Sequence, residues 1–316
     1  MKLTIVLTVY NKEQYLRRAL DSILAQTGVH TDDFEVLAVN DGSTDGSLTI
    51  LEEYAKADKR VRILTQRNQG LSMARNNGVT EAKGDYVWFV DADDTISQQS
   101  VELICEAMDS EPDIIPIYAK TEGVDKVRNK VTRAAETGKD ILLSKNWDTC
   151  GVFNIFRKDY LKERQISFYP GIYHEDTEFT PRALYYAAKA VVVPEVLYYV
   201  FKTEGSITMV PKPKRAFDCL FVAESNNRII DDNNERGTNV GRALCERVAG
   251  TITSSLNTIT KNDHSEWPAF NDALYEKRHL FKSMEESGVL RYWLLAKIFR
   301  IFPKKYVQIY NLFKKI

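Results

Sequence analysis

The stretch that decides the fold is Tyr86-Val87-Trp88-Phe89-Val90-Asp91-Ala92-Asp93-Asp94. The unbroken aromatic and β-branched run before Asp91 predicts a strand over Asp85–Val90, of the kind that is buried on both faces of a parallel sheet. Three carboxylates then follow within four residues. Because ligands bind outside the carboxyl ends of strands in such sheets, this stretch predicts an α/β fold and also the place of its site.

Outward from this strand, the first 120 residues alternate predicted strands and helices. The helices carry apolar residues at helical spacing, and one of them spans Leu71–Ala82. The other predicted strands are Leu3–Val9, Phe34–Val39, Val61–Leu64 and Asp113–Tyr118. Apolar strands separated by helices predict a mainly parallel sheet that helices cover on both faces.

The acidic cluster Asp91, Asp93 and Asp94 favours a divalent cation. Carboxylates this close repel one another unless a cation joins them. Oxygen ligands suit Mg²⁺ or Mn²⁺, and such sites combine one or two carboxylates with substrate phosphates. The alternative is that Asp94, Thr95 or Ser97 caps the following helix, but a cap explains only one of the acids.

Two further clusters each have two interpretations. Asp41 directly follows a predicted strand, where its carboxylate could accept hydrogen bonds from a ribose or a base, yet Asn40–Asp45 is also typical of a turn and helix cap. Arg75 and Asn76 could contact a nucleotide or orient the acidic cluster. Alternatively, Gly70–Gly78 is only a short helix that stops at its glycine.

Taken in order, these motifs resemble the nucleotide-sugar-binding half of family 2 glycosyltransferases. The motifs are Thr8-Val9-Tyr10-Asn11, Asp41-Gly42-Ser43-Thr44-Asp45, Gly70 to Gly78 with Arg75 and Asn76, and Asp91-Ala92-Asp93-Asp94. The resemblance covers residues 1–120 motif by motif and continues loosely to about 210. It implies a GT-A fold and an inverting, metal-dependent hexosyl transfer in bacterial polysaccharide or glycolipid assembly. The implied donor is a nucleoside-diphosphate sugar, with a UDP-sugar first among them, and the acceptor is a saccharide or a lipid-linked saccharide.

The resemblance also implies a role for each site residue. The nucleotide-sugar side would comprise Thr8, Tyr10, Asn11, Asp41, Arg75, Asn76, Asp91 and Ala92. Asp93 and Asp91 would hold Mn²⁺ or Mg²⁺. Asp176, with Glu175 beside it, would be the catalytic base, since an inverting transfer needs a group to take the acceptor hydroxyl proton. Alternatively, Thr180-Pro181 starts a helix and both acids are solvated residues before it.

The predicted domains are a catalytic domain over 1–212 and a helical region over 213–316. Within the first, residues 1–120 would bind the nucleotide sugar and residues 121–212 would face the acceptor. Helices such as Ala216–Ile230 and Val240–Leu256 are predicted in the second.

The last segment, 289–316, carries seven Lys or Arg residues and no Asp or Glu. Its basic, aromatic-rich amphipathic pattern is typical of helices that lie on anionic membranes. Packing on the protein itself or in a homodimer remains the alternative. With four separated cysteines, no predicted signal peptide and no predicted transmembrane segment, the expected location is cytoplasmic, or peripheral on the inner face of the plasma membrane.

Several function classes are excluded or disfavoured. The net charge of −1 gives no reason to expect nucleic acid. The chain has neither G-x-G nor G-x-x-x-x-G-K, which argues against dinucleotide dehydrogenases and P-loop enzymes. A sugar nucleotidyltransferase would need a glycine-rich loop after the first strand, and Thr8–Lys12 has no glycine. A non-catalytic module that binds a nucleotide or a partner stays open.

Overall fold

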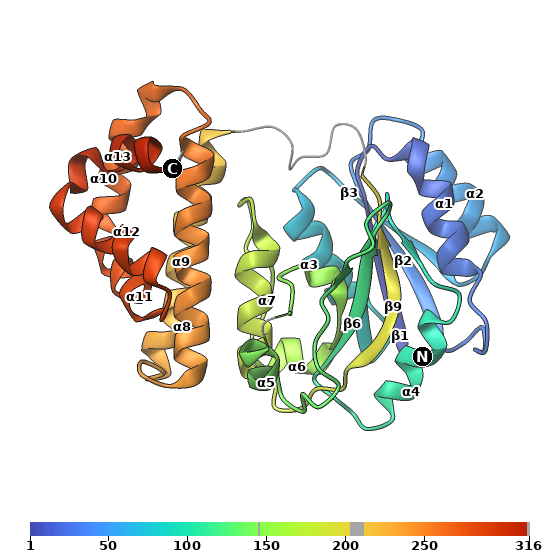
Figure 1. Ribbon diagram of the computed structural model, residues 1–316. Helices are drawn as coiled ribbons and strands as arrows, with labels where there is room; N and C mark the ends of the chain where they lie inside the picture. Colours follow the sequence, from blue (N-terminus) through green and yellow to red (C-terminus); the bar gives the residue numbers. More distant parts are fainter. Residues whose placement is uncertain (145, 203–211, 315–316) are drawn as a thin grey trace. The chain divides into compact units, whose positions relative to one another are not determined.

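The computed structural model describes residues 1–144, 146–202 and 212–314. A nine-stranded sheet has the strand order β3-β2-β1-β4-β8-β6-β9-β5, with β7 paired to β6. Helices lie on both sides of this sheet, with α1 and α2 on one side and α3 and α6 on the other (Figure 1). The strands are β1 Leu3–Val9, β2 Phe34–Asp41, β3 Val61–Gln66, β4 Tyr86–Asp91, β5 Thr95–Ile96, β6 Ile114–Thr121, β7 Val127–Arg128, β8 Asn154–Arg157 and β9 Val193–Val200.

The helices alternate with these strands at first and then continue alone. Those that precede β9 in the chain are α1 Glu13–Leu24, α2 Ser47–Ala57, α3 Leu71–Glu81, α4 Ser100–Met108, α5 Gly138–Leu143, the 3-10 turn η1 Gly151–Phe153, α6 Lys158–Glu163 and α7 Glu175–Tyr186. Those that follow are α8 Pro213–Asp232, α9 Asn239–Ile259, α10 Trp267–Glu276, α11 Phe281–Glu286, α12 Leu290–Ile301 and α13 Tyr306–Phe313, with 3-10 turns η3 His264–Glu266, η4 Arg278–Leu280 and η5 Pro303–Lys305.

The predicted parallel strands are confirmed, and the sheet as a whole is mixed. Every residue of β1 and β2 is buried, as expected for strands with helices over both faces. The pairs β1–β2, β1–β4, β2–β3 and β6–β9 are parallel. However, β8 lies antiparallel between β4 and β6. A strand of four residues is too short to show its direction in the sequence.

The strand order creates one switch point, at β1. Chain segments β2 and β3 lie to one side of β1, and β4 lies to the other. Thr8 is therefore opposite both Val39 of β2 and Asp91 of β4. In open α/β sheets the crevice at such a point is where ligands bind, so the fold brings the predicted clusters to one place.

Gly78 lies inside α3 rather than ending it, so the interpretation of a helix that stops at its glycine is wrong. A Cβ at this position would come within 2.3 Å of a Val6 methyl carbon. The glycine is thus needed because α3 packs directly against β1. This close packing sets the position of Arg75, one turn earlier on the same helix.

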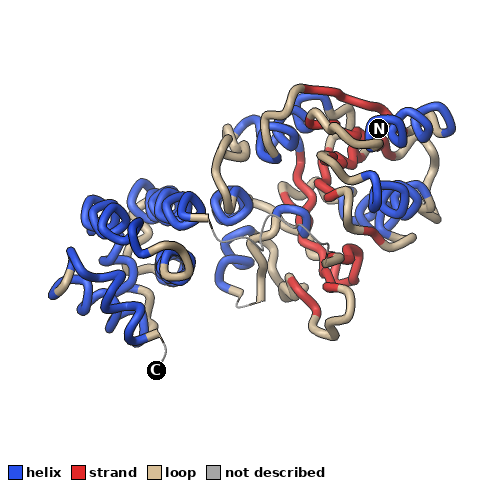
Figure 2. The backbone as a smooth tube through the Cα atoms, turned by 90° about the horizontal axis from the view of Figure 1, so that it is seen from above, coloured by secondary structure: helices blue, strands red, loops and turns tan. Residues whose placement is uncertain are grey.

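The described chain forms two compact units. The first comprises Met1–Gly171 and Ala183–Glu204, and the second comprises Ile172–Arg182 and Gly205–Ile316. Helix α7 thus contributes its first turns to the second unit and its last turn to the first. The second unit consists of helices (Figure 2), and within it α8 and α9 make the most extensive contact. The predicted boundary at residue 212 stays a prediction.

Helix α7 starts at Glu175 and has Pro181 in its interior, so the alternative interpretation, a helix that starts at Thr180-Pro181, is wrong. Proline has no N–H to donate to the carbonyl four residues earlier, here that of Thr177. The side-chain amide of Asn226 on α8 donates to that carbonyl instead, at 3.1 Å. A contact from a distant helix therefore allows the proline to lie within the helix.

Helices α8 and α9 confirm the predicted helices over 216–230 and 240–256. In the part of the chain that the structure describes, no helix has the length and apolar composition needed to cross a membrane.

Candidate functional site

Asp91 ends β4 and lies at the centre of the predicted site. Its carboxylate accepts hydrogen bonds from Arg75 Nη2 at 3.1 Å and from Thr8 Oγ1 at 3.4 Å. Its backbone N–H donates to the Tyr198 hydroxyl at 3.1 Å. Since the side chain is still 32% exposed, it can reach a ligand on its open side.

Arg75 holds its charge inside the protein, with only 1% of the residue exposed. Its guanidinium carbon lies 5.0 Å from the centre of the Phe168 ring and 6.0 Å from that of Phe89. A buried charge requires a partner of opposite sign, and Asp91 supplies it. Arg75 therefore fixes the orientation of Asp91, which is one of the two roles considered for it.

Asp93 has different cationic neighbours. Its carboxylate is 2.5 Å from the Lys12 ammonium nitrogen, and its backbone carbonyl accepts from Arg18 Nη2 at 2.6 Å. The Lys12 side chain is 29% exposed and that of Asp93 is 17% exposed. Sequence reasoning missed both cations, because neither belongs to the motifs of the acidic cluster.

The Asp94 side chain is buried and makes structural contacts, so its carboxylate is not exposed to a ligand. It is 5% exposed and accepts from the Tyr198 hydroxyl and the Phe201 N–H, each at 2.8 Å. Burial, reinforced by the negative charge of Asp91, raises the pKa of Asp94 to about 7. The Tyr198 hydroxyl thus joins Asp94 to the backbone of Asp91. A tyrosine among apolar strand residues, whose buried hydroxyl needs a partner, was the signal for this role.

The arrangement fits a divalent cation bound by Asp91 and Asp93. Among the described residues, no group of three or more His, Cys, Asp or Glu side chains could hold a metal. Two carboxylates are nevertheless enough when substrate phosphates supply further ligands. In this structure the Lys12 ammonium is the cation that pairs with the Asp93 carboxylate.

Asp41, at the end of β2, is 4% exposed and binds the loop between β3 and α3. It accepts from Gln66 Nε2 and the Gln69 N–H at 2.8 Å and from the Gly70 N–H at 2.9 Å. Gly42 follows with φ +71°, and a Cβ there would lie 2.7 Å from the Asn68 nitrogen. The sequence therefore needs a glycine where this loop approaches.

Tyr10 and Asn11 follow β1. Tyr10 is 46% exposed, as a side chain that stacks on a ligand would be. Asn11 has φ +52°, and its side-chain oxygen accepts from the Thr44 N–H at 2.8 Å. The Asn11 N–H donates to Ser43 Oγ at 3.1 Å. These contacts bring the loops after β1 and β2 together.

Asn76 and Ala92 have structural contacts. The Asn76 amide donates to the Phe168 carbonyl at 2.8 Å and its oxygen accepts from the Phe168 N–H at 2.9 Å. Ala92 is 1% exposed. Their predicted roles beside the nucleotide sugar are not tested by these contacts.

Glu175 and Asp176 lie in the first turn of α7, in the second unit, together with Glu178. Acids are favoured in this turn by the helix dipole. Glu178 is 3% exposed and pairs with Arg182 at 2.8 Å, so it serves the packing of the unit. Glu175 and Asp176 are only half-buried. Of the three, they are the more exposed.

His174 precedes this turn with φ +65°. Burial, and secondarily the charge of Arg215, lowers the pKa of His174. A lowered pKa favours the neutral imidazole. His174 is therefore better described as a polar residue next to the acids than as a charged one.

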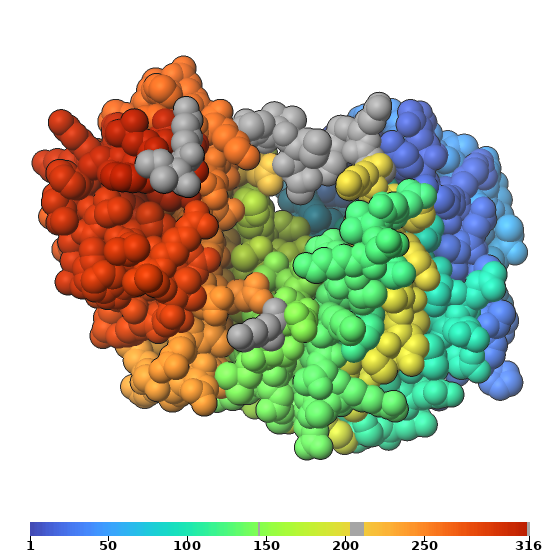
Figure 3. All heavy atoms as spheres, viewed as in Figure 1, coloured from blue at the N-terminus to red at the C-terminus, as the bar shows by residue number. Residues whose placement is uncertain are grey.

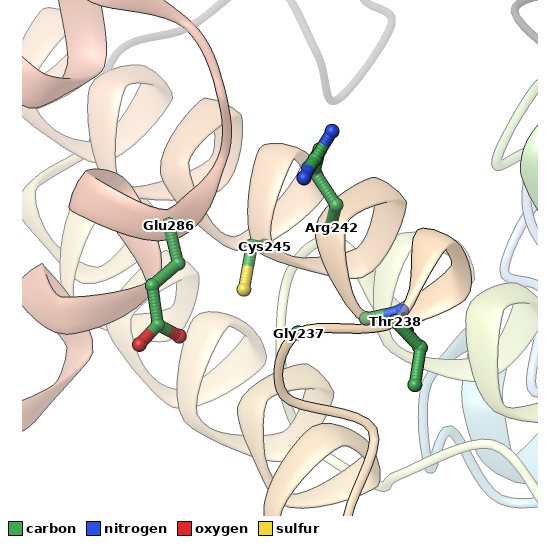
Figure 4. Close-up of a pocket in the computed structure, with 6 residues that line it drawn as sticks. Gly237, Thr238, Arg242, Cys245 and Glu286 are labelled. Atoms are coloured by element: carbon green, nitrogen blue, oxygen red, sulfur yellow. Dashed lines mark hydrogen bonds between the residues drawn. The ribbon is translucent and has the colours of Figure 1, made fainter.

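A pocket within the second unit is lined by residues of α9, the preceding loop and α11 (Figure 4). Its lining residues are Gly237, Thr238, Gly241, Arg242, Cys245 and Glu286. Burial raises the pKa of the Cys245 thiol, and Glu286 pairs with Arg236 at 2.5 Å. The pocket thus offers neither a thiolate nor an open acid for group transfer.

Comparison with known proteins shows which family the sequence matches. Residues 4–165 match the family model described as glycosyl transferase family 2. EpsH of Bacillus subtilis is 30% identical over 243 residues, which are 73% of this chain and 70% of EpsH. TarS of Staphylococcus aureus, a poly(ribitol-phosphate) beta-N-acetylglucosaminyltransferase, is 31% identical over 210 residues, which are 65% of this chain and 36% of TarS.

Solved structures show the same fold. A structure of S. aureus TarS in complex with UDP-GlcNAc superposes with a TM-score of 0.74 at 23% identity, over 98% of this chain and 88% of that chain. The mannosyltransferase PcManGT from Pyrobaculum calidifontis, in complex with GDP-Man and Mn²⁺, gives a TM-score of 0.53 at 16% identity, over 100% of this chain and 88% of that chain. The predicted GT-A fold is thereby confirmed.

Proposed function

Because the chain belongs to glycosyltransferase family 2, we propose that it transfers a hexose from a UDP-sugar to a hydroxyl of a saccharide or lipid-linked saccharide. The observation that carries the proposal is the cluster of Thr8, Arg75 and Asp91 at the switch point of the sheet. The UDP-GlcNAc bound by TarS supports the choice of nucleotide. The name of TarS supports an acceptor in surface polysaccharide assembly.

The donor would lie at the ends of β1, β2 and β4. The nucleoside pocket would be lined by Thr8, Tyr10, Asn11 and Asp41. Asp41 would give up one of its hydrogen bonds to the loop and form one with the base or ribose. Asp91 and Asp93 would hold Mn²⁺ or Mg²⁺ against the diphosphate. When bound, the cation would stabilise the charge of the departing nucleoside diphosphate.

Asp176 would act as the base, with Glu175 beside it. It would take the proton of the acceptor hydroxyl as that oxygen attacks the anomeric carbon, and the bond to the nucleoside diphosphate would break on the opposite face. Attack from that face inverts the configuration. Arg75 would keep Asp91 oriented through the hydrogen bond between them. We place the reaction in the cytoplasm, where separated cysteines stay reduced.

The first test is a thermal-shift panel of UDP, GDP, dTDP and CMP, with and without Mn²⁺. A ligand at about a hundred times its dissociation constant adds about 2.7 kcal/mol. We expect UDP with Mn²⁺ to raise the melting temperature, and Asp93→Asn to lose the part that depends on Mn²⁺. A response to none of the nucleotides in folded protein would contradict the donor site and favour a non-catalytic module.

The base is tested separately with Asp176→Asn. This variant should bind UDP and Mn²⁺ like wild type and lower the rate of sugar transfer by about a hundredfold or more. Normal turnover would assign the base to another residue. Nuclear magnetic resonance of the product's anomeric proton would report inversion or retention.

A further inference from the structure

The C-terminal helices α12 and α13 expose an unusual number of large apolar side chains. Of the fourteen exposed large hydrophobic residues in the described chain, seven lie between residues 290 and 313. Single exposed apolar residues are normal on a protein surface, but a contiguous group marks an interaction site. The seven are Leu290, Trp293, Leu294, Ile301, Phe302, Leu312 and Phe313, with exposed fractions of 71%, 41%, 47%, 68%, 46%, 70% and 55%.

This exposure is not a sign of loose packing, because the opposite face of α12 is firmly held. Phe299 stacks on Phe281 of α11 with ring centres 3.7 Å apart. The hydroxyl of Tyr306, which is fully buried, donates to the Leu295 carbonyl at 3.1 Å. The helix therefore has an inner face in the core of the second unit and a separate outer face that is apolar.

The outer residues of α12 follow helical spacing. Leu290, Trp293, Leu294, Lys297 and Ile301 are three or four positions apart, so they form one stripe along the helix. Lys297 interrupts the stripe with its ammonium group 4.9 Å from the centre of the Trp293 ring. A lysine that lays its stem along an apolar surface and its charge at the edge is typical of membrane interfaces.

The charges around the stripe have one sign. The described residues 289–314 contain six cations and no acid: Arg291, Lys297, Arg300, Lys304, Lys305 and Lys314. Glu285 of α11 pairs with Lys297 at 3.1 Å and with Arg300 at 2.8 Å. The described part of this segment therefore carries six positive charges and no negative charge of its own.

We propose that this surface, the outer face of α12 with η5 and the end of α13, docks on an anionic lipid bilayer. The C-terminal helices lie on the surface of the second unit, drawn in red in Figure 3. Tryptophan and phenylalanine would enter the boundary of headgroups and acyl chains, while the cations contact the headgroups. Each basic residue near such a surface adds about 1 kcal/mol to binding. The inference is independent of the transfer reaction.

Charge favours lipid over a second copy of the chain. In a two-fold dimer the same patch meets itself, so the cations of one copy would approach those of the other. Like charges brought together across an interface are unfavourable. An anionic headgroup layer instead complements every one of them.

The test is co-sedimentation of the full chain with vesicles of phosphatidylcholine, with and without phosphatidylglycerol. Wild type should bind only the anionic vesicles, and less as salt rises. Removing two cations with Lys304→Gln/Lys305→Gln should weaken binding about thirtyfold, from about 1 kcal/mol for each residue. Lys59→Gln, whose side chain is 76% exposed in the first unit, is the matched control and should bind like wild type.

The apolar part is tested with Leu290→Ser/Ile301→Ser, whose side chains are too exposed for the change to disturb the core. It should also release the protein from the vesicles, whereas Tyr275→Ser, which is 46% exposed on α10, should not. Equal binding to both vesicle types, or to neither, would overturn the proposal. A dimer that Leu290→Ser/Ile301→Ser dissociates, without any vesicle binding, would assign the surface to a second copy and also overturn it.

Discussion

At the level of single residues, two protein cations compensate the acidic turn after β4 in different ways. Arg75 is buried beside two aromatic rings and pairs with Asp91. The Lys12 side chain is 29% exposed, and that of its partner Asp93 is 17% exposed. We expect the first pair to persist and the second to open when a divalent cation binds.

Replacement of Lys12 tests this difference. In Lys12→Met the ammonium no longer competes for Asp93, so Mn²⁺ should bind the nucleotide-free protein about fivefold more tightly, since a partly exposed ion pair contributes about 1 kcal/mol. Calorimetric titration with Mn²⁺ alone measures the change. Lys59→Met removes a lysine outside the site and should leave Mn²⁺ affinity unchanged. Equal affinities of Lys12→Met and wild type would place the metal away from Asp93.

Glu35 gives the stability a defined pH dependence. It is 3% exposed and accepts from Thr4 Oγ1 and the Lys83 N–H at 2.8 Å and from Arg62 Nε at 3.1 Å. Burial acts to raise its pKa, but these hydrogen bonds outweigh burial and lower the pKa below the ordinary value of 4.5. The stabilisation is therefore present above about pH 4.5 and is lost as pH falls through the lowered pKa.

We expect Glu35→Gln to lower the free energy of unfolding by about 2 kcal/mol at neutral pH, because it removes hydrogen bonds to a charged group. The difference from wild type should shrink as the pH falls below 4.5 in urea titrations. Asp32→Asn changes a side chain that is 87% exposed and should have little effect at any pH. A constant difference across the titration would mean that the charge of Glu35 is not what stabilises the fold.

At the level of elements, the sequence predicts strands well where they are buried on both faces. Strands β1, β2 and β4 are such runs, so their composition alone identifies them. Strand β8 escapes prediction because its four residues pair through neighbours that are far away in the sequence. The alternative helix start at Thr180-Pro181 is wrong because the Asn226 side chain, distant in the sequence, allows Pro181 to lie inside α7.

The contribution of Asn226 to the stability of α7 can be measured with a double-mutant cycle of Asn226 and Pro181. Asn226→Leu removes the donor to the Thr177 carbonyl and should make α7 open more easily, by about 1 kcal/mol. In a Pro181→Ala background the new N–H at 181 can serve the same carbonyl, so the cost of Asn226→Leu should largely disappear. Amide exchange of Glu175–Tyr186 reports both. Equal costs in the two backgrounds would show that Asn226 acts by packing alone.

The site shows the same limit of local reasoning. Asp41, Asp91 and Asp93 follow strands directly, so strand ends predict that they gather at one edge. Tyr198 comes from the last strand of the first unit, and Lys12 from the start of α1. Their contacts depend on the strand order, which the sequence does not state.

At the level of the whole molecule, the proposed functions fall on different units. The donor residues Thr8, Asp41 and Asp91 belong to the first unit, and the proposed base and the lipid-binding surface belong to the second. Helix α7 contributes residues to both units, and the proposed base lies in its first turn, in the second unit. Binding of the donor and binding of the membrane should therefore protect different parts of the chain from amide exchange.

Amide exchange with two ligands tests this separation. UDP with Mn²⁺, at about a hundred times its dissociation constant, adds about 2.7 kcal/mol and should protect peptides that cover Leu3–Val9, the loop before α3 and Tyr86–Asp91. It should leave α12 and α13 unchanged. Anionic vesicles should do the reverse, because they would contact only the C-terminal surface. If UDP instead protected only α12 and α13, the donor site would lie in the second unit and the assignment of Asp41 and Asp91 would be wrong.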